Sequence, residues 1–537
     1  MRYIDNKDMK SAMKRNLLVA LALVCSFSLS AQEERKNRGP IDLTENLQYN
    51  VEAQTSFSEG KTPLWLNANR YGLSSLDEMN GYLRAGVERP LRTDSLRRWG
   101  VGYGVDVAVP YHFTSSVVVQ QAYAEARWLH GALTVGSKQQ PMELKNNRLS
   151  TGAQTLGINA RPVPQVRLSL PDYWTLPGTN YWVHLKGHIA YGKMTDQNWQ
   201  HDFTARQQSY ADGMLYHSKA GYLMIGKEDA FYPLSVELGL EMASTFGGTA
   251  HVRQLDGTMQ TYEGEKGLKS MWHAFVPGGA DSGEDVYQNA EGDQLGSWMA
   301  RVNWNSETWR LSFYADKFFE DHSSMLQLDY DGYGEGDEWQ AKKKRRYLLY
   351  DFKDWMLGTE LQFKYGTWLR HIVFEYLYTK YQSGPIYHDH TRGLKDHVGG
   401  MDNFYNHYIY PGWQHWGQVM GNPLYRSPLY NDDDGSIEVL DNRFTALHLG
   451  LDGGYNDFSY RMLATWQQGV GTYHHPFTRS HHNLSVLLEG MWQPTKGALR
   501  GWTLCAAYGM DLGAILGNNY GLQVTVARHG LFKDKKK

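Results

Sequence analysis

Four segments of the chain carry an aromatic or apolar residue at each end of a ten-residue step, with polar and apolar positions alternating between: 101–111, 181–191, 355–365 and 368–378. In the second, Leu185 and Ile189 share one face of a strand while Lys186 and His188 share the other, because strand side chains alternate with period two. Ten steps of about 3.3 Å, tilted by about 45°, rise about 24 Å, close to the apolar band of an outer-membrane barrel. The pattern therefore predicts strands that cross a membrane.

The same two-residue period recurs along the chain. Clear further segments are 47–57, 236–242, 298–304, 309–315, 458–466, 484–492, 502–510 and 520–526, and weaker ones are 82–87, 122–128, 133–135, 166–170, 222–225 and 444–451. We predict an all-β fold, an antiparallel transmembrane β-barrel of about 16–18 strands, in which closure removes every sheet edge. A soluble sandwich of this size is unusual, and no blade-length repeat supports a propeller.

Composition agrees with a membrane barrel. The 537 residues include 36 Tyr, 18 Trp and 55 Gly, which suit aromatic girdles and tight turns. Lys plus Arg is 54 against 57 for Asp plus Glu, so no basic surface indicates nucleic acid. If the N-terminal region is removed, Cys505 is the only cysteine, and it falls on the polar face of its strand.

The N-terminus has the pattern of an export signal. Lys10, Lys14 and Arg15 precede an apolar run at 17–29, which small residues follow up to Ala31. We predict a signal peptide at residues 1–31, a single barrel domain at 32–537 and a place in the outer membrane of a Gram-negative bacterium. The strand at 520–526, close to the C-terminus, suits recognition by the barrel-assembly machinery.

Connections between the predicted strands differ in length, as in barrels with short turns at one end and long extracellular loops at the other. The long ones are roughly 253–297, 317–354 and 381–443. Residues 63–77 lack alternation and are predicted to form a short N-terminal helical or plug element.

The loop at 381–423 has the richest chemistry. Aromatic rings can stack on the apolar faces of sugars, while amide, carboxylate and imidazole groups bind hydroxyls. The alternative is that these rings pack a folded loop. The candidate glycan-binding residues are Asp402, Asn403, Tyr405, His407, Trp413 and Trp416.

The run GGMDNFYNHYIYPGWQHWGQVMGNPL at 399–424 resembles the signature loop of Wzi-type capsule-assembly outer-membrane proteins. PLWLNANRYGL from Pro63, YADKFFEDHSSM from Tyr314 and FEYLYTKYQSGP from Phe374 agree with the resemblance, which spans nearly the whole mature chain. Residues 325–354 look like an insertion relative to the family pattern. The resemblance implies a barrel of about 18 strands with an N-terminal helical element. It also implies a non-enzymatic surface lectin that holds exported capsular polysaccharide.

Two other functions stay open. A porin or glycan channel needs an open polar lumen, and an outer-membrane hydrolase needs a serine, a histidine and an acidic residue at one wall. No cofactor or metal is expected; the expected partners are surface or capsular polysaccharide, outer-membrane lipid and lipopolysaccharide. The polar residues predicted to face the lumen are Lys186, His188, Glu237, Glu241, Arg301 and Glu360.

Overall fold

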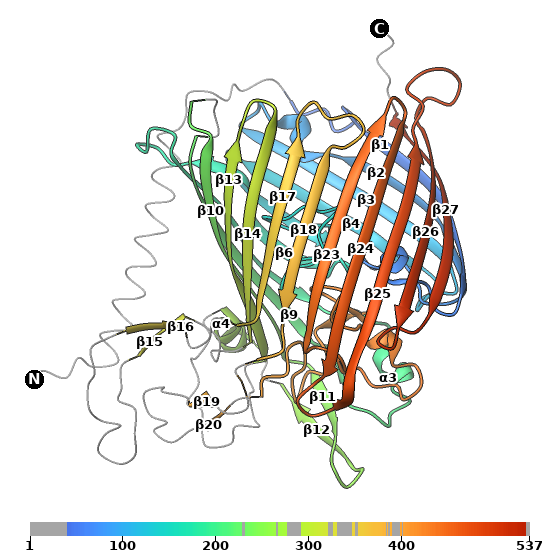
Figure 1. Cartoon of the computed structure of the whole chain (residues 1–537). Coiled ribbons are helices and arrows are strands. Elements are labelled where there is room, and N and C mark those ends of the chain that lie inside the picture. The colour runs from blue at the N-terminus through green and yellow to red at the C-terminus, as the bar shows by residue number, and fades with distance from the viewer. Residues whose placement is uncertain are drawn as a thin grey trace, which may run out of the picture.

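The computed structural model of the chain describes residues 40–227, 231–264, 267–275, 292–320, 326–329, 346–349, 353–382, 384, 387–388, 398–399 and 401–532. Within them, eighteen antiparallel strands form one sheet that closes on itself (Figure 1). The first strand, β1 (Gln48–Glu59), pairs with β2 (Met79–Arg89) on one side and with the last strand, β27 (Asn519–Leu531), on the other. The predicted signal peptide and the insertion at 325–354 lie largely outside the described residues.

Each of the eighteen predicted segments overlaps one strand of the barrel, so the predicted closed antiparallel β-barrel of about 16–18 strands is confirmed. The other barrel strands are β3 (Trp99–Tyr111), β4 (Val118–Trp128), β5 (Gly131–Ser137), β6 (Gln165–Thr175), β7 (Val183–Lys193), β9 (Leu215–Ile225), β10 (Leu234–Phe246), β13 (Asp293–Asn305), β14 (Trp309–Glu320), β17 (Trp355–Phe363), β18 (His371–Tyr378), β23 (Phe444–Tyr455), β24 (Phe458–Gly471), β25 (Pro476–Trp492) and β26 (Trp502–Gly513).

Short elements occupy the connections. The helical ones are α2 (Leu64–Asn67), η1 (Leu91–Asp94), α3 (Trp199–Phe203), α4 (Leu268–Phe275) and η3 (Pro428–Tyr430). The short strands are β8 (Tyr210–Asp212), β11 (Thr249–Arg253), β12 (Met259–Glu263), β15 (Leu326–Asp329), β16 (Arg346–Leu349), β19 (Tyr387–His388), β20 (Val398–Gly399), β21 (Gln414–His415) and β22 (Gln418–Val419). In the described part of the chain, no helix is long and apolar enough to cross a membrane.

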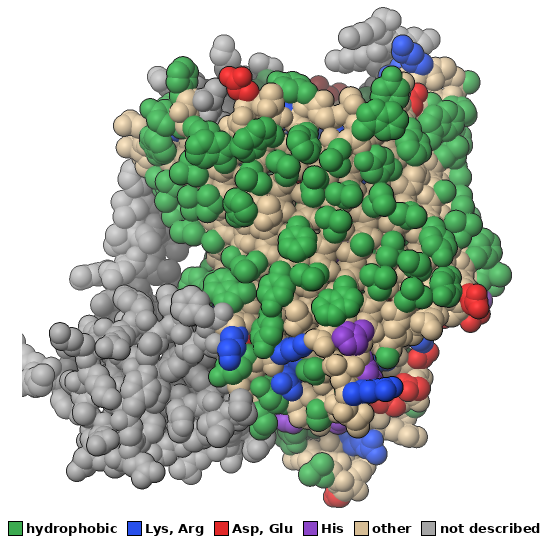
Figure 2. Space-filling view, viewed as in Figure 1, with side chains coloured by type: hydrophobic (Ala, Val, Ile, Leu, Met, Phe, Trp, Pro, Cys, Tyr) green, Lys and Arg blue, Asp and Glu red, His purple; other side chains and the backbone are tan. Residues whose placement is uncertain are grey.

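The wall has an apolar outer face and a polar inner face. On β3, Val105 is 56% exposed and Asp106 only 6%. Figure 2 shows hydrophobic side chains over most of the visible outer wall, with charged and histidine side chains below them. At the end of the barrel where β1 begins and β27 ends, here called the terminus end, Trp99 packs on Trp128 and Trp368 stacks on Tyr455, with ring centroids 6.1 and 5.3 Å apart. Such an apolar band with aromatic rings at its rim suits a lipid bilayer.

The two ends of the barrel differ. Connections at the terminus end are short, such as 129–130, 306–308 and 456–457. At the opposite end, here called the far end, long connections include 138–164, 247–292 and 379–443. The far end lies at the bottom of Figure 1, where α3, β11 and β12 project from the wall.

Three ends of the ten-residue steps fall in turns at the terminus end. One is Tyr365, because β17 ends at Phe363. Tyr181 has a positive φ of 62° and lies in the turn before β7, which begins at Val183. Trp368 likewise precedes β18, which begins at His371. All three rings are exposed and lie at the rim of the barrel, outside the strands. The ten-residue step marked the rim aromatics correctly but extended the strands into the turns.

The predicted helical element at 63–77 contains α2, whose four residues are all buried. Leu64 N donates to Asp511 Oδ2 of β26 at 3.0 Å, and Trp65 Nε1 donates to Thr465 Oγ1 of β24 at 3.1 Å. A Cβ at Gly509 would lie 2.8 Å from Leu66 Cγ, so this glycine lets the helix approach the inner wall. The helix therefore lies inside the barrel.

Candidate functional site

Three far-end connections fold back into the barrel. We call them the lumen segments: residues 60–78, 138–164 and 401–442. They share one large apolar core, in which Leu66, Leu149 and Trp413 are fully buried. Much of their backbone is not in strands or helices, so its polar groups need other partners. These partners come from the wall and from one another.

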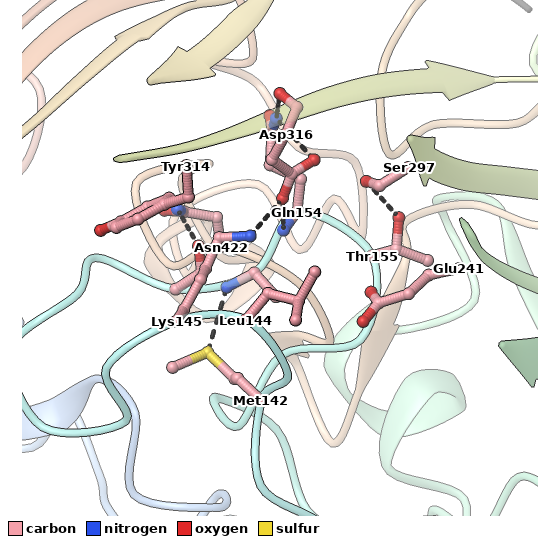
Figure 3. Close-up of polar contacts among 12 residues, drawn as sticks. Met142, Leu144, Lys145, Gln154, Thr155, Glu241, Ser297, Tyr314, Asp316 and Asn422 are labelled. Atoms are coloured by element: carbon pink, nitrogen blue, oxygen red, sulfur yellow. Dashed lines mark hydrogen bonds and ion pairs between the residues drawn. The ribbon is translucent and has the colours of Figure 1, made fainter. Parts of the chain in front are cut away.

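The segment 138–164 leaves β5 and reaches the opposite wall. Lys145 Nζ lies 2.6 Å from Asp316 Oδ2 on β14, and both side chains are about 1% exposed. Thr151 donates to Glu375 Oε2 on β18 through both its N–H and its hydroxyl, each at 2.7 Å. Figure 3 shows Gln154 directed at Asp316 and Thr155 at Ser297 of β13. The segment is thus fixed to several strands across the lumen.

The segment 401–442 packs on 138–164. Asn422 Nδ2 donates to Gly152 O at 2.9 Å, and Asn159 Nδ2 donates to Val419 O at 3.0 Å. The first segment joins them, because Gln418 Nε2 donates to Ser74 Oγ at 2.9 Å. Together the three segments form a hydrogen-bonded layer across the barrel.

Three of the six predicted glycan-binding residues are interior. Tyr405 and Trp413 are 0% exposed, and Trp416 is 8% exposed. The Trp413 ring lies 6.1 Å from Tyr216, and the Arg161 guanidinium lies 4.1 Å above the Trp416 ring. The expectation that these rings are open stacking platforms is not met, because their faces are covered by other side chains. The alternative interpretation, in which the aromatics pack a folded loop, describes them.

The other three predicted residues are only partly buried. Asn403 Oδ1 accepts from Asn442 Nδ2 at 2.6 Å and from Asn406 Nδ2 at 3.1 Å, so this amide oxygen holds the loop together. Asp402 N donates to Gln382 O at 3.0 Å. His407 Nδ1 accepts from the backbone N–H groups of Ile409 and Tyr410, 3.2 and 3.4 Å away. These residues support the loop whatever else they contact.

Burial lowers the pKa of His407 from 6.5 to about 4. The direction matches the geometry, because a ring nitrogen that accepts hydrogen bonds must carry no proton. His407 is therefore neutral at pH 7.

The sequence did not single out the exposed aromatics of the far end. Tyr408 is 45% exposed, and its ring packs edge to face on Tyr262 of β12 with centroids 6.3 Å apart. The Tyr408 hydroxyl lies within hydrogen-bond distance of Gln254. Tyr408 lies in the aromatic-rich loop that the sequence analysis identified. Its residue type does not distinguish it from the buried aromatics of that loop, and only the tertiary structure shows that it is exposed.

The six polar residues predicted to face the lumen do so. Arg301 Nη1 donates to Leu144 O at 3.0 Å, and Glu360 Oε1 accepts from Asn146 Nδ2 at 2.8 Å. The others contact the lumen segments or inner-wall groups: Lys186 with Glu143, Glu241 with Leu156, Glu237 with Tyr173 and His188 with Ser218.

Hollows remain inside the described part of the barrel. A cavity of about 90 Å³ separates the segment 138–164 from β6, β7, β9 and β10. A larger hollow of about 660 Å³ lies at the terminus end, lined in part by Asn50, Glu88 and Asp106.

A serine and a histidine do meet at one wall, as the hydrolase hypothesis requires. His188 Nε2 lies 3.1 Å from Ser218 Oγ. Among the described residues, however, no carboxylate hydrogen-bonds the other ring nitrogen of His188. The third member of a catalytic triad, which would orient the imidazole, is not in place there.

The closed sheet, the apolar outer wall and the polar inner wall define an outer-membrane-type β-barrel of eighteen strands, whose far half is occupied by folded segments. Comparison with family models gives no match, and comparison with curated proteins gives none either.

Among solved structures, Pseudomonas aeruginosa OprD is 8% identical, covering 91% of this chain and 96% of its own, with a TM-score of 0.42. Pseudomonas aeruginosa OccK5 (OpdH) is also 8% identical, covering 91% and 99%, with a TM-score of 0.44. A loop-deletion mutant of OmpT, an outer membrane protein of Vibrio cholerae, is 7% identical, covering 90% and 98%, with a TM-score of 0.36. At these values the likeness assigns no function to the chain, and the barrel rests on its own strand pairing.

Proposed function

We propose that the chain is a non-enzymatic outer-membrane protein that binds exported polysaccharide, capsular in the first instance, at the surface of a Gram-negative cell. This is the function implied by the resemblance to the Wzi-type family. The observation that supports it is the layer of lumen segments. A wall-to-wall layer fixed by buried contacts such as Lys145 with Asp316 suits a protein that holds a ligand better than one that conducts.

The far end offers the matching surface. Tyr408 and Tyr262 present aromatic rings beside the amide of Gln254. An aromatic ring next to a hydrogen-bonding amide is the combination that a sugar requires. We place polysaccharide contact there, with Asp402 at the edge of the same loop. The surrounding partners are outer-membrane lipid and lipopolysaccharide, and the barrel-assembly machinery acts on the chain during insertion.

The direct test uses the full chain refolded in detergent, with purified capsular polysaccharide as the probe. We expect saturable binding by the parent protein and about tenfold weaker binding by Tyr408→Ala, from the loss of one stacking surface worth about 1–3 kcal/mol by analogy with bases stacked on aromatics. Tyr365, which is 80% exposed in the turn after β17 at the opposite end of the barrel, supplies the control variant Tyr365→Ala. Absence of binding by folded parent protein would contradict the proposal.

A porin or glycan channel is the second candidate, and one observation favours it. The hollow of about 660 Å³ at the terminus end is polar and lies where a channel vestibule would be. Planar-bilayer recording separates the two functions. We expect little or no conductance from the parent protein; steady open-channel currents without polysaccharide binding would establish the channel instead.

A further inference from the structure

The cavity of about 90 Å³ contains an arginine whose donors are unused. Arg167 lies on β6 between Val166 and Leu168, which are 52% and 60% exposed on the outer face. Alternation therefore directs Arg167 inward, and its side chain lines the cavity. It forms no hydrogen bond or ion pair with any residue that the structure describes. A partly buried guanidinium with five N–H donors normally has acceptors nearby.

The other basic groups lining this cavity are occupied. Lys138 Nζ pairs with Glu125 at 2.7 Å. Arg161 donates to the hydroxyls of Ser115 and Thr114, each at 2.9 Å. Arg167 is thus the positive group that remains available to a ligand.

The carboxylates around Arg167 are also occupied. Glu143 pairs with Lys186 at 2.7 Å. Glu241 accepts from the Tyr222 hydroxyl at 2.7 Å and from Leu156 N at 3.3 Å. Neither acid is hydrogen-bonded to Arg167, so its charge is not neutralised by direct contact within the cavity.

Two further features define the ligand. Gln165, two residues before Arg167 on the same face, has a buried Oε1 without a hydrogen-bond partner, so it is available to a hydroxyl donor. Tyr71, Tyr216 and Tyr222 supply aromatic surface around the same space. The volume corresponds to about six water molecules, so the occupant is small.

We propose that this cavity is a binding site for a hydroxylated carboxylate, specifically one hexuronate unit. The carboxylate accepts from the Arg167 guanidinium in a bidentate contact, a sugar hydroxyl donates to Gln165 Oε1, and the tyrosine rings cover the apolar face. The site lies within the barrel, apart from the far-end surface of Tyr408, and goes beyond the polysaccharide binding proposed there.

The test is calorimetric titration of the refolded full chain with sodium glucuronate, glucose and inorganic phosphate as separate probes. We expect glucuronate to bind at least tenfold more tightly than glucose or phosphate. Arg167→Gln should weaken glucuronate binding at least tenfold, while Arg528→Gln, at an exposed arginine on β27, should match the parent. A heat-dependent shift in gel mobility verifies that each variant is folded.

Three results would overturn the site: no glucuronate binding by folded parent, equal binding by Arg167→Gln, or phosphate or glucose binding as tight as glucuronate. Gln165→Leu is a second variant that keeps the charge and should weaken glucuronate binding more than phosphate binding. Equal weakening contradicts the sugar assignment.

Polysaccharide retention by cells is measured separately. If cells fail to retain polysaccharide although the protein binds glucuronate, the proposed function is refuted and the cavity site stands. If cells retain polysaccharide although the protein does not bind glucuronate, the cavity site is refuted and the proposed function stands.

Discussion

Lys145 and Asp316 form an ion pair inside the barrel, with Nζ and Oδ2 2.6 Å apart and both side chains almost inaccessible to solvent. The pair joins the segment 138–164 to β14, six strands away from β5 around the barrel. Its position makes it the sharpest probe of what holds the lumen segments in place.

Lys145→Met should destabilise the protein by about 3–5 kcal/mol, because it leaves the Asp316 carboxylate buried without its counter-ion. Urea unfolding of the detergent-refolded protein, followed by gel mobility, measures the loss. Lys186→Met is the matched control, since the Lys186–Glu143 pair is about one-fifth exposed and is worth less. The double variant K145M/D316M should recover most of the stability. Equal losses for Lys145→Met and Lys186→Met would contradict the assigned burial.

Val105→Arg should impair membrane assembly by about 2–4 kcal/mol, because Val105 faces outward at the middle of β3 and the charge would enter the lipid midplane. The control Asn50→Arg places the same side chain in the terminus-end hollow and should be mild. Folding yield into lipid vesicles is the measurement. A reversed order of effects would show that the inner and outer faces are misassigned.

Trp413→Ala and Tyr408→Ala should have opposite signatures. Trp413 is 0% exposed, so its truncation leaves an interior cavity that destabilises the lumen segments by about 3–5 kcal/mol. Tyr408→Ala removes an exposed ring and should lower polysaccharide binding per folded molecule with little change in stability. Urea unfolding and binding to the folded fraction separate the two effects. Loss of binding without loss of stability in Trp413→Ala would restore Trp413 as a binding residue.

Gly509→Val should displace α2, because any Cβ at this position meets Leu66 and Pro63. Valine suits a strand, so the barrel itself should persist. We expect faster proteolysis within residues 60–78 and a rise in bilayer conductance. Ala506→Val, on the outer face of the same strand, is the control and should change neither. Unaltered proteolysis in Gly509→Val would contradict the docking of α2 on β26.

Acid should loosen the loop around His407. Its pKa is lowered from 6.5 to about 4 in the folded state, so the unfolded chain binds the proton more readily. The stability from neutral His407 is present above pH 6.5, falls as pH drops towards 4 and is then fully lost, a change of at most about 3 kcal/mol.

His407→Gln should flatten this part of the pH profile, since Gln Oε1 can still accept from the backbone. Burial raises the pKa of Asp441 to about 7, so Asp441 acts in the opposite direction: its contribution is present below pH 3.8 and is lost as pH rises through 7. The difference between parent and His407→Gln unfolding curves at pH 7 and pH 4.5 isolates the histidine. No difference would show that folding does not favour the neutral form of His407.

The local residue pattern is enough to specify the wall of the barrel. Because lipid lies outside the wall and polar groups lie inside it, apolar and polar residues alternate along each strand. The outward orientation of Val105 and the inward orientation of Asp106 can therefore be predicted from the sequence of that strand alone. Even a strand as short as β5 was recognisable in this way. The pattern failed to predict only the strand ends at the rim, as at Tyr181, because aromatic residues occur there in both the turns and the strands.

The arrangement of side chains inside the lumen depends on tertiary contacts that no local pattern predicts. Trp413 and Tyr408 lie in one loop with similar chemistry, yet one is in the core and the other is exposed, because burial of Trp413 depends on residues such as Thr155 and Tyr216 that are distant in the chain. No local period encodes such contacts. Arg167 is the same case: residue type gives its charge, but whether that charge is paired depends on where every neighbouring carboxylate and hydroxyl lies in the folded barrel.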